Sequence, residues 1–331
     1  MKRRFVMMIL AAAAVVPASA QKVPLVKALT DEWPEIVKVD GIEIVHVQKN
    51  IYMLVGGGAN VTLQIGDEGA FLVNAGSPGQ GDNLVAAVRH LTRKPLRFLV
   101  NTGADPDEVG GNAAVVAAAG GPTGVVAGAA GRPANAGILT VAHENTVNRM
   151  TAGAPGMPGL TGDAIPISTF FTARKDFYAN GEAVQILHQP HARTDGDVIV
   201  FFRGTDVISA GDLFRTDSYP VIDPTKGGSI QGELDALNML LDLAVPERNQ
   251  MGGTRVVPGH GRVSNEADVL EYRDMLTIIR DRVSDLVKQN MTLEQVKAAN
   301  PTLEYDGLYN SEEMTGNRLL EVIYHDLTQK K

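Results

Sequence analysis

The chain lacks cysteine: none of its 331 residues carries a thiol. This absence excludes disulfide bonds, lipid attachment through a cysteine, and the thiolate ligands that some metal sites use. Basic residues are fewer than acidic ones, with 30 Lys and Arg against 38 Asp and Glu. An acidic protein of this kind is not expected to favour nucleic acid or anionic membrane surfaces as partners.

A long hydrophobic run is also missing, because the apolar run at residues 5–16 is too short to span a bilayer. It follows three basic residues and precedes a proline and the small residues Ala18-Ser19-Ala20. This order is typical of a secretory signal peptide, here residues 1–20, cleaved after Ala20. We therefore expect a periplasmic or secreted protein. Without the signal, 27 basic and 38 acidic residues remain, a net charge of −11.

The composition is that of a folded protein, because 44% of the residues are hydrophobic and a disordered chain carries far fewer. The length suits one large α/β domain with a helical appendix. We place the main domain at residues 21–263 and a C-terminal helical extension of the same domain at residues 264–331.

Hydrophobic periodicity predicts the elements of this domain. Apolar runs, many of them alternating, indicate strands at residues 42–47, 51–55, 61–65, 70–73, 98–100, 139–143, 183–187, 198–202, 207–209 and 255–257. Helical spacing or composition indicates helices at 82–91, 113–119, 144–150 and 229–243, with others that begin at Asn265, Thr292 and Ser311. Residues 120–170 are rich in Gly, Ala and Pro, which favours loops, and we expect a long irregular loop at 151–168.

The stretch Asn101–Asn112 follows the predicted strand at 98–100 and precedes an alanine-rich helix. It therefore lies at the C-terminal end of a strand, where open α/β sheets bind their ligands. Within it, Asp105, Asp107 and Glu108 occupy three of four consecutive positions. Carboxylates this close repel one another unless water or a cation screens them. This loop is therefore the first candidate for a functional site.

Four further segments follow in order: Gly110-Gly111-Asn112, Thr194-Asp195-Gly196-Asp197, Gly211-Asp212-Leu213-Phe214 and Pro258-Gly259-His260-Gly261. Together with the acidic loop they resemble the metallo-β-lactamase superfamily. The resemblance covers residues 42–261. It implies an α/β fold, an αββα sandwich of two mixed β-sheets flanked by helices, on which the C-terminal helices pack. It also implies a site at these segments, where superfamily members hold two metal ions.

The family's metal ligands are only partly present in this chain. The family's loop reads Asn-Thr-His-x-His-x-Asp-His-x-Gly-Gly-Asn, and here Gly103, Asp105 and Glu108 replace its histidines. Arg193 stands where a further histidine ligand belongs, and a guanidinium has no lone pair for a metal. Asn74 replaces an aspartate that supports the metals. His191, two residues before Arg193, is expected near the site, and ligation by it is the less favoured alternative.

The ligands for one divalent cation remain by resemblance: Asp107, Glu108, Asp212 and His260. Three oxygen donors and one imidazole suit Mn²⁺, Fe²⁺, Mg²⁺ or Ca²⁺, and Zn²⁺ is also a candidate. A two-zinc centre is not expected. The alternative is a vacant site whose acids are solvated or protonated.

Arg193 would bring a permanent positive charge among these acids. We expect it to fill the place of the lost metal and to pair with Asp105, Asp212 or both, because a guanidinium grips carboxylates with parallel hydrogen bonds. The alternative is that Arg193 points to solvent, as most arginines do.

Three functions follow. One is a hydrolase with a single metal ion, in which Asp107 or Asp212 guides a proton; its β-lactamase activity would be absent or very weak. Another is a metal-free pseudoenzyme that binds a small molecule or another ligand in its groove. The last is a structural or interaction protein. We favour the pseudoenzyme, because the changes at Gly103, Asp105, Glu108 and Arg193 affect one site together.

Overall fold

The computed structural model describes residues 37–123, 137–153 and 158–329. The signal peptide expected at residues 1–20 lies outside the described residues, as do residues 124–136 and 154–157 of the expected loop region. In the described part of the chain, no helix is long and apolar enough to cross a membrane.

One sheet of eight described strands follows chain order from β1 to β8. Its first five strands pair antiparallel, and β5 to β8 pair parallel. The C-terminal ends of β5, β6 and β7 therefore lie at the same edge of the sheet, where the acidic loop follows β6. The strands are β1 (Val37–Val39), β2 (Ile42–Gln48), β3 (Ile51–Val55), β4 (Val61–Ile65), β5 (Ala70–Val73), β6 (Leu96–Val100), β7 (Leu139–His143) and β8 (Ser168–Phe170).

A second sheet of five described strands has the order β13-β12-β11-β10-β9. Its strands pair antiparallel except β12 and β13, which are parallel, so these two end at the same edge. The strands are β9 (Arg174–Ala179), β10 (Glu182–Gln189), β11 (Asp197–Phe202), β12 (Val207–Arg215) and β13 (Arg255–His260).

The two sheets face each other across an apolar core. Phe71 and Phe98 of the first sheet contribute to it, as do Phe177, Val200 and Phe202 of the second. The rings of Phe71 and Phe202 meet edge to face, with centroids 5.3 Å apart. Alternate residues of a strand point to opposite faces, so each sheet also presents an apolar outer face that helices cover.

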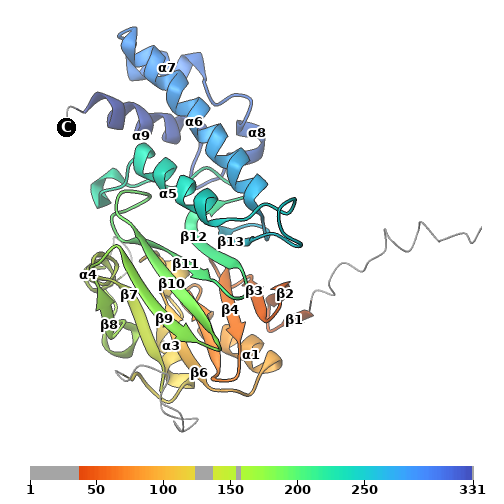
Figure 1. Cartoon of the computed structure of the whole chain (residues 1–331). Helices are drawn as coiled ribbons and strands as arrows, with labels where there is room; N and C mark the ends of the chain where they lie inside the picture. The colour runs from red at the N-terminus through yellow and green to blue at the C-terminus, as the bar shows by residue number, and fades with distance from the viewer. Residues whose placement is uncertain (1–36, 124–136, 154–157, 330–331) are drawn as a thin grey trace, which may run out of the picture. The chain divides into compact units, whose positions relative to one another are not determined.

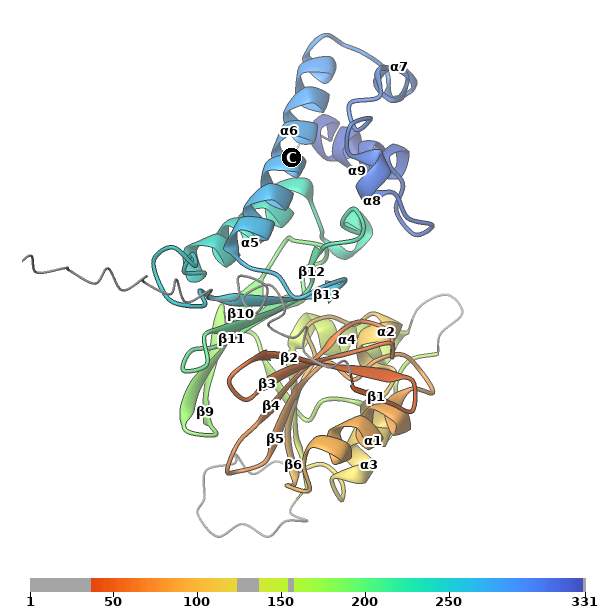
Figure 2. The same cartoon turned by 90° about the vertical axis from the view of Figure 1, so that its right-hand side faces the viewer.

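Helices cover these outer faces and complete four layers (Figures 1 and 2). On the first sheet, Leu84 and Val88 of α1 and Val115 of α3 join the outer core. On the second sheet, α5, α6, α7 and α9 share one cluster with β12. The helices are α1 (Gly81–Leu91), α2 (Pro106–Val109), α3 (Asn112–Ala118), α4 (Glu144–Ala152), α5 (Ile230–Leu243), α6 (Glu266–Lys288), α7 (Leu293–Ala299), α8 (Asp306–Tyr309) and α9 (Gly316–Thr328).

The expected αββα sandwich with C-terminal helices packed on it is therefore confirmed. Helix ends agree with their capping residues: Asn265 caps α6 and Thr292 caps α7, each in a capping box. The last helix begins at Gly316, later than the expected Ser311, because Thr315 caps it.

Three strands were not expected from the sequence: β1, β8 and β9. The β9–β10 hairpin turns at Asn180 and Gly181, whose φ angles are +51° and +82°. An Asn-Gly pair is a strong hairpin signal because both residues accept positive φ. It was overlooked because β9 is largely polar and only half-buried.

Candidate functional site

The candidate site lies where strands of both sheets end. Asn74 follows β5, the loop Asn101–Asn112 follows β6, and Arg193 lies in the loop after β10. Asp212 and Arg215 belong to the last part of β12, and His260 ends β13. The elements that were expected to carry the site therefore bring it together.

Hydrogen bonds fix the acidic loop at both ends. The side chains of Asn101 and Asn112 exchange two hydrogen bonds, of 3.0 and 2.9 Å, and both residues are buried. Between them Pro106 begins the short helix α2, with Asp105 as its N-cap. Proline suits this position because its nitrogen has no hydrogen to leave unsatisfied. The three acidic side chains are thus held on one tight turn.

Arg193 lies buried among these acids, with 4% of its side chain exposed. Its guanidinium forms an ion pair with Asp105, lies 3.5 Å from Asp212, and donates through Nε to the carbonyl of Val221 at 3.2 Å. The Arg193 charge holds the pKa of Asp105 below its usual value, against the opposite effect of burial. Arg193 was expected to pair with Asp105, Asp212 or both, and this expectation is confirmed because its guanidinium pairs with both.

A second arginine, Arg215, extends this arrangement. Its guanidinium lies 4.0 Å from Asp212 and 3.0 Å from Glu313, which belongs to the segment between α8 and α9. Charges therefore alternate from the loop after β6 to the C-terminal extension, in the order Asp105, Arg193, Asp212, Arg215, Glu313. Arg215 was not among the residues expected at the site, although it comes directly after the segment Gly211-Asp212-Leu213-Phe214.

Glu108 points away from the arginines into a buried polar cluster. Its Oε1 accepts from the hydroxyl of Thr102 at 2.7 Å and from Asn74 Nδ2 at 3.4 Å, and its Oε2 accepts from the Asp105 amide at 3.3 Å. Burial raises the pKa of Glu108 well above its usual value, and the charges of Asp212 and Asp105 add to the shift.

Asn74 supports this cluster from the end of β5. It has a φ angle of +68°, a conformation that asparagine adopts more readily than most residues. Its Oδ1 accepts from the Thr102 amide at 2.9 Å and its Nδ2 donates to the Thr102 hydroxyl at 2.8 Å. Asn74 thus sets the position of Thr102, which in turn holds Glu108.

His260 lies beside two further carboxylates. Its Nε2 is 3.0 Å from Asp107 Oδ2 and 3.5 Å from Asp212 Oδ1. Burial opposes protonation of His260, but the hydrogen bond to Asp107 and the charge of Asp212 outweigh it and raise the pKa. For Asp212, burial raises the pKa, while Arg193, Arg215 and His260 counteract it.

Two histidines of the recognised segments lie apart from these acids. His191 is exposed, and its Nδ1 is 3.3 Å from the carbonyl oxygen of Gly227. His188 stacks on His143, with ring centroids 3.6 Å apart. Glu233 of α5 was also unforeseen: it is fully buried, and in the described residues neither carboxyl oxygen has a hydrogen-bond partner. Burial raises its pKa well above the usual value.

The donors do not fit a two-metal centre. Gly103 offers no ligand. Arg193 forms ion pairs with Asp105 and Asp212, and the Glu108 carboxyl accepts a hydrogen bond from Thr102. Among the described residues, no group of three or more His, Asp or Glu side chains is arranged to hold a metal ion. The proposed set for one cation is divided: Asp107, Asp212 and His260 lie together, whereas Glu108 belongs to the neighbouring cluster.

Two depressions open beside Arg193 and share a wall made by Asp105, Pro106, Arg193, Thr194 and Lys226. We call the larger one, of about 380 Å³, the acidic depression, because its other walls include Asp107, Asp223 and Glu313. We call the smaller one, of about 250 Å³, the basic depression, because it adds Arg149 of α4.

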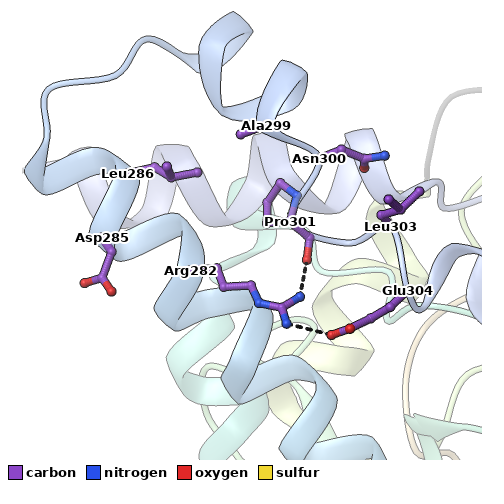
Figure 3. A pocket seen from close by; sticks show the side chains of 8 residues that line it. All are labelled: Arg282, Asp285, Leu286, Ala299, Asn300, Pro301, Leu303 and Glu304. Carbon is purple, nitrogen blue, oxygen red and sulfur yellow. Dashed lines mark hydrogen bonds and ion pairs between the residues drawn. The ribbon is translucent and has the colours of Figure 1, made fainter.

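Another depression, of about 520 Å³, lies in the C-terminal extension (Figure 3). At its edge Arg282 donates to the carbonyl of Pro301 at 2.9 Å and pairs with Glu304 at 2.7 Å. These contacts tie α6 to the segment that follows α7. Because these polar contacts join parts of the C-terminal extension, we assign the depression a structural role.

The family model described as the metallo-beta-lactamase superfamily matches residues 54–260, more than half of the chain. The chain belongs to the metallo-β-lactamase superfamily. No curated protein matches the sequence. Superfamily members usually bind divalent metal ions, and in this member arginines pair with acids at the corresponding place.

Solved structures of other superfamily proteins share the fold. The inverting sec-alkylsulfatase Pisa1 from Pseudomonas sp. is 14% identical, with a TM-score of 0.64 over 85% of this chain and 49% of its own. The metallo-β-lactamase from Pontibacter korlensis is 18% identical, with a TM-score of 0.53 over 71% of this chain and 99% of its own. DIM-1 metallo-β-lactamase is 16% identical, with a TM-score of 0.52 over 73% and 99%. This chain spans about half the length of the sec-alkylsulfatase.

Proposed function

We propose that this superfamily member is a metal-independent ligand-binding protein, a pseudoenzyme whose groove binds a small molecule. The observation that carries the proposal is the position of Arg193 between Asp105 and Asp212. We further propose, from the signal-like N-terminus, that it acts in the periplasm or outside the cell.

The charges support this proposal. A divalent cation at the site would have to displace Arg193 and approach a guanidinium that cannot lose its proton. Arg193 is buried, and breaking a buried ion pair costs about 3–5 kcal/mol. Arg215 adds positive charge next to Asp212, and the imidazole of His260 lies beside the same carboxylate. The site therefore has internal cations where relatives use metal ions.

Metal analysis tests the proposal. The protein would be purified without chelator, and its Zn, Mn, Fe, Mg and Ca content measured by inductively coupled plasma mass spectrometry. We expect less than about one tenth of an equivalent of each, and no rise in melting temperature with added Zn²⁺, Mn²⁺ or Ca²⁺, since a ligand that binds the folded state raises it. One equivalent of tightly held metal would contradict the proposal.

A second candidate is a hydrolase with a single divalent cation. It is favoured by the position of His260, whose Nε2 lies 3.0 Å from Asp107 Oδ2 and 3.5 Å from Asp212 Oδ1. Nitrocefin or carbapenem turnover within about tenfold of a typical kcat near 10 s⁻¹ would support this candidate. We expect turnover to be absent or very weak, because Gly103 and Arg193 provide no ligands for a second ion.

A further inference from the structure

The acidic and basic depressions have opposite net charge. Four carboxylates line the acidic depression, those of Asp105, Asp107, Asp223 and Glu313, against two cations, Arg193 and Lys226. Three cations line the basic depression, Arg149, Arg193 and Lys226, against Asp105 and Asp197. Of these two acids, Asp197 is directed inward, where it accepts from the Thr194 amide at 2.6 Å.

Within the shared wall between the depressions, Asp105 and Arg193 neutralise each other, and Arg193 is buried. Lys226 also belongs to this wall and lines both depressions. The charges left for a ligand are therefore that of Lys226 and those at the two ends. A ligand with a single charge would be attracted by one depression and repelled by like charges in the other. Such repulsion discriminates against a singly charged ligand that extends across both depressions.

The groups at the ends keep bonding capacity. Glu313 pairs with Arg215 through one oxygen, and 57% of its side chain is exposed. Asp107 contacts His260 through Oδ2, and a carboxylate accepts several hydrogen bonds. Lys226 pairs with Asp223 at 3.1 Å and Arg149 pairs with Asp195, but an ammonium group has three donors and a guanidinium group has five.

The basic depression also offers apolar surface. Ala104, Pro106 and Ala152 line it next to Arg149. A pocket with mostly apolar contacts and a few placed charges suits the carbon chain of a small ligand with a charged end.

We propose that the two depressions together bind a small zwitterion of the amino-acid class. Its ammonium group lies in the acidic depression, near Asp107, Asp223 and Glu313. Its carboxylate lies in the basic depression, near Lys226 and Arg149. This inference rests on the proposed function, since it needs a groove without a metal centre.

Isothermal titration calorimetry tests the inference with glycine, 4-aminobutanoate and 6-aminohexanoate, which separate the two charges by increasing lengths. The matched probes are hexanoate and hexylamine, each of which keeps one of the two charges. We expect at least one zwitterion to bind about tenfold more tightly than either matched probe, a difference of about 1.4 kcal/mol. Equal binding of the singly charged probes, or no saturable binding of any zwitterion, would overturn the inference.

Two variants locate the site. Lys226→Gln removes a charge from the carboxylate end and Glu313→Gln one from the ammonium end. Their controls are Lys288→Gln, on the exposed surface of α6, and Glu312→Gln, which is exposed beside Glu313. We expect each site variant to weaken zwitterion binding at least about fivefold. Each control should change the dissociation constant less than about twofold. The gap between these two effects corresponds to about 0.5 kcal/mol. Equal effects of site variants and controls would place the ligand elsewhere and overturn the inference.

Titrations run with and without EDTA separate this inference from the proposed function. Binding that persists in EDTA with the expected charge preference supports both. Binding that disappears in EDTA would overturn the proposed function, because it would show that a metal ion is needed. Absence of zwitterion binding under both conditions would overturn this inference alone.

Discussion

Gly103 and Glu108 compete for one volume: a Cβ added to Gly103 would lie 3.0 Å from the carboxyl carbon of Glu108, and closer still to its Oε2. The Glu108 carboxyl cannot move away freely, because it is buried and accepts hydrogen bonds from Thr102, Asn74 and the Asp105 amide. A side chain at position 103 and the inward Glu108 therefore exclude each other. The two departures from the family's loop act as a pair.

Gly103→Ala should consequently destabilise the fold by about 1–3 kcal/mol, as overpacking of a buried site does. In a Glu108→Ala background the same change should cost much less, because the space is then open. Urea denaturation of the two single variants and the double variant measures this coupling. Gly307→Ala, in open space within α8, is the control and should be neutral or stabilising. Equal costs of Gly103→Ala in both backgrounds would contradict the shared volume.

Removal of Arg193 should be costly for a different reason. Arg193→Ala leaves Asp105 and the buried Asp212 without their nearest cation, and we expect a loss of about 3–5 kcal/mol in the free energy of unfolding. Arg262→Ala is the control, since Arg262 pairs with Asp268 at 2.6 Å but 66% of its side chain is exposed. That exposed pair should contribute about 0–1 kcal/mol. Guanidinium denaturation measures the free energy of unfolding of both variants. Similar losses in the two would show that the ion pair of Arg193 is effectively solvated.

A metal ion should partly replace the missing guanidinium. In Arg193→Ala, the acids Asp105, Asp107 and Asp212 would be free to attract a divalent cation, so Mn²⁺ or Zn²⁺ should raise the melting temperature in a concentration-dependent way. At 100 times the dissociation constant the stabilisation is about 2.7 kcal/mol. Arg262→Ala and the unmodified protein should not respond. A metal response of the unmodified protein as large as that of the variant would contradict the replacement of the ion by Arg193.

The sequence was sufficient for the fold and for the pairing of Arg193, because both depend on segments with recognisable order. Strands such as β2 alternate between apolar and polar residues, and Arg193 stands where the family resemblance placed a metal ligand. The direction of Glu108 was not predictable, since a glutamate in this loop can reach either Asp212 or Thr102. Its choice depends on the space at Gly103 and the hydrogen bonds of Asn74.

The partners of Arg215 were hidden for another reason. Glu313 follows Arg215 by 98 positions and belongs to the C-terminal extension, so no local pattern joins them. The contact between Arg149 and the turn after Asp223 was likewise not predictable, because Arg149 donates to the carbonyl of Lys226, 77 positions later, at 2.8 Å. The contacts that shape the groove are thus tertiary, whereas the strands around it follow from local patterns in the sequence.

His143 caps the helix that forms one wall of the basic depression. Its Nδ1 accepts from the Asn145 amide at 3.3 Å, and its ring stacks on His188. The capping hydrogen bond disfavours the imidazolium, because protonation of Nδ1 removes the acceptor. A positive ring at a helix N-terminus also opposes the helix dipole. Burial, followed by the charge of His188, lowers the pKa of His143 to about 4.

Stability should therefore fall as the solution becomes acidic. Above about pH 6.5 His143 is neutral in both states and contributes nothing. As the pH falls below this value the unfolded chain binds the proton first, so the free energy of unfolding decreases until the folded state is protonated near the pKa of about 4. His143→Asn keeps a capping residue and removes this titration. Denaturation between about pH 7 and pH 4.5 should show that the unmodified protein loses on the order of 2 kcal/mol more than this variant, and parallel curves would contradict the role of His143.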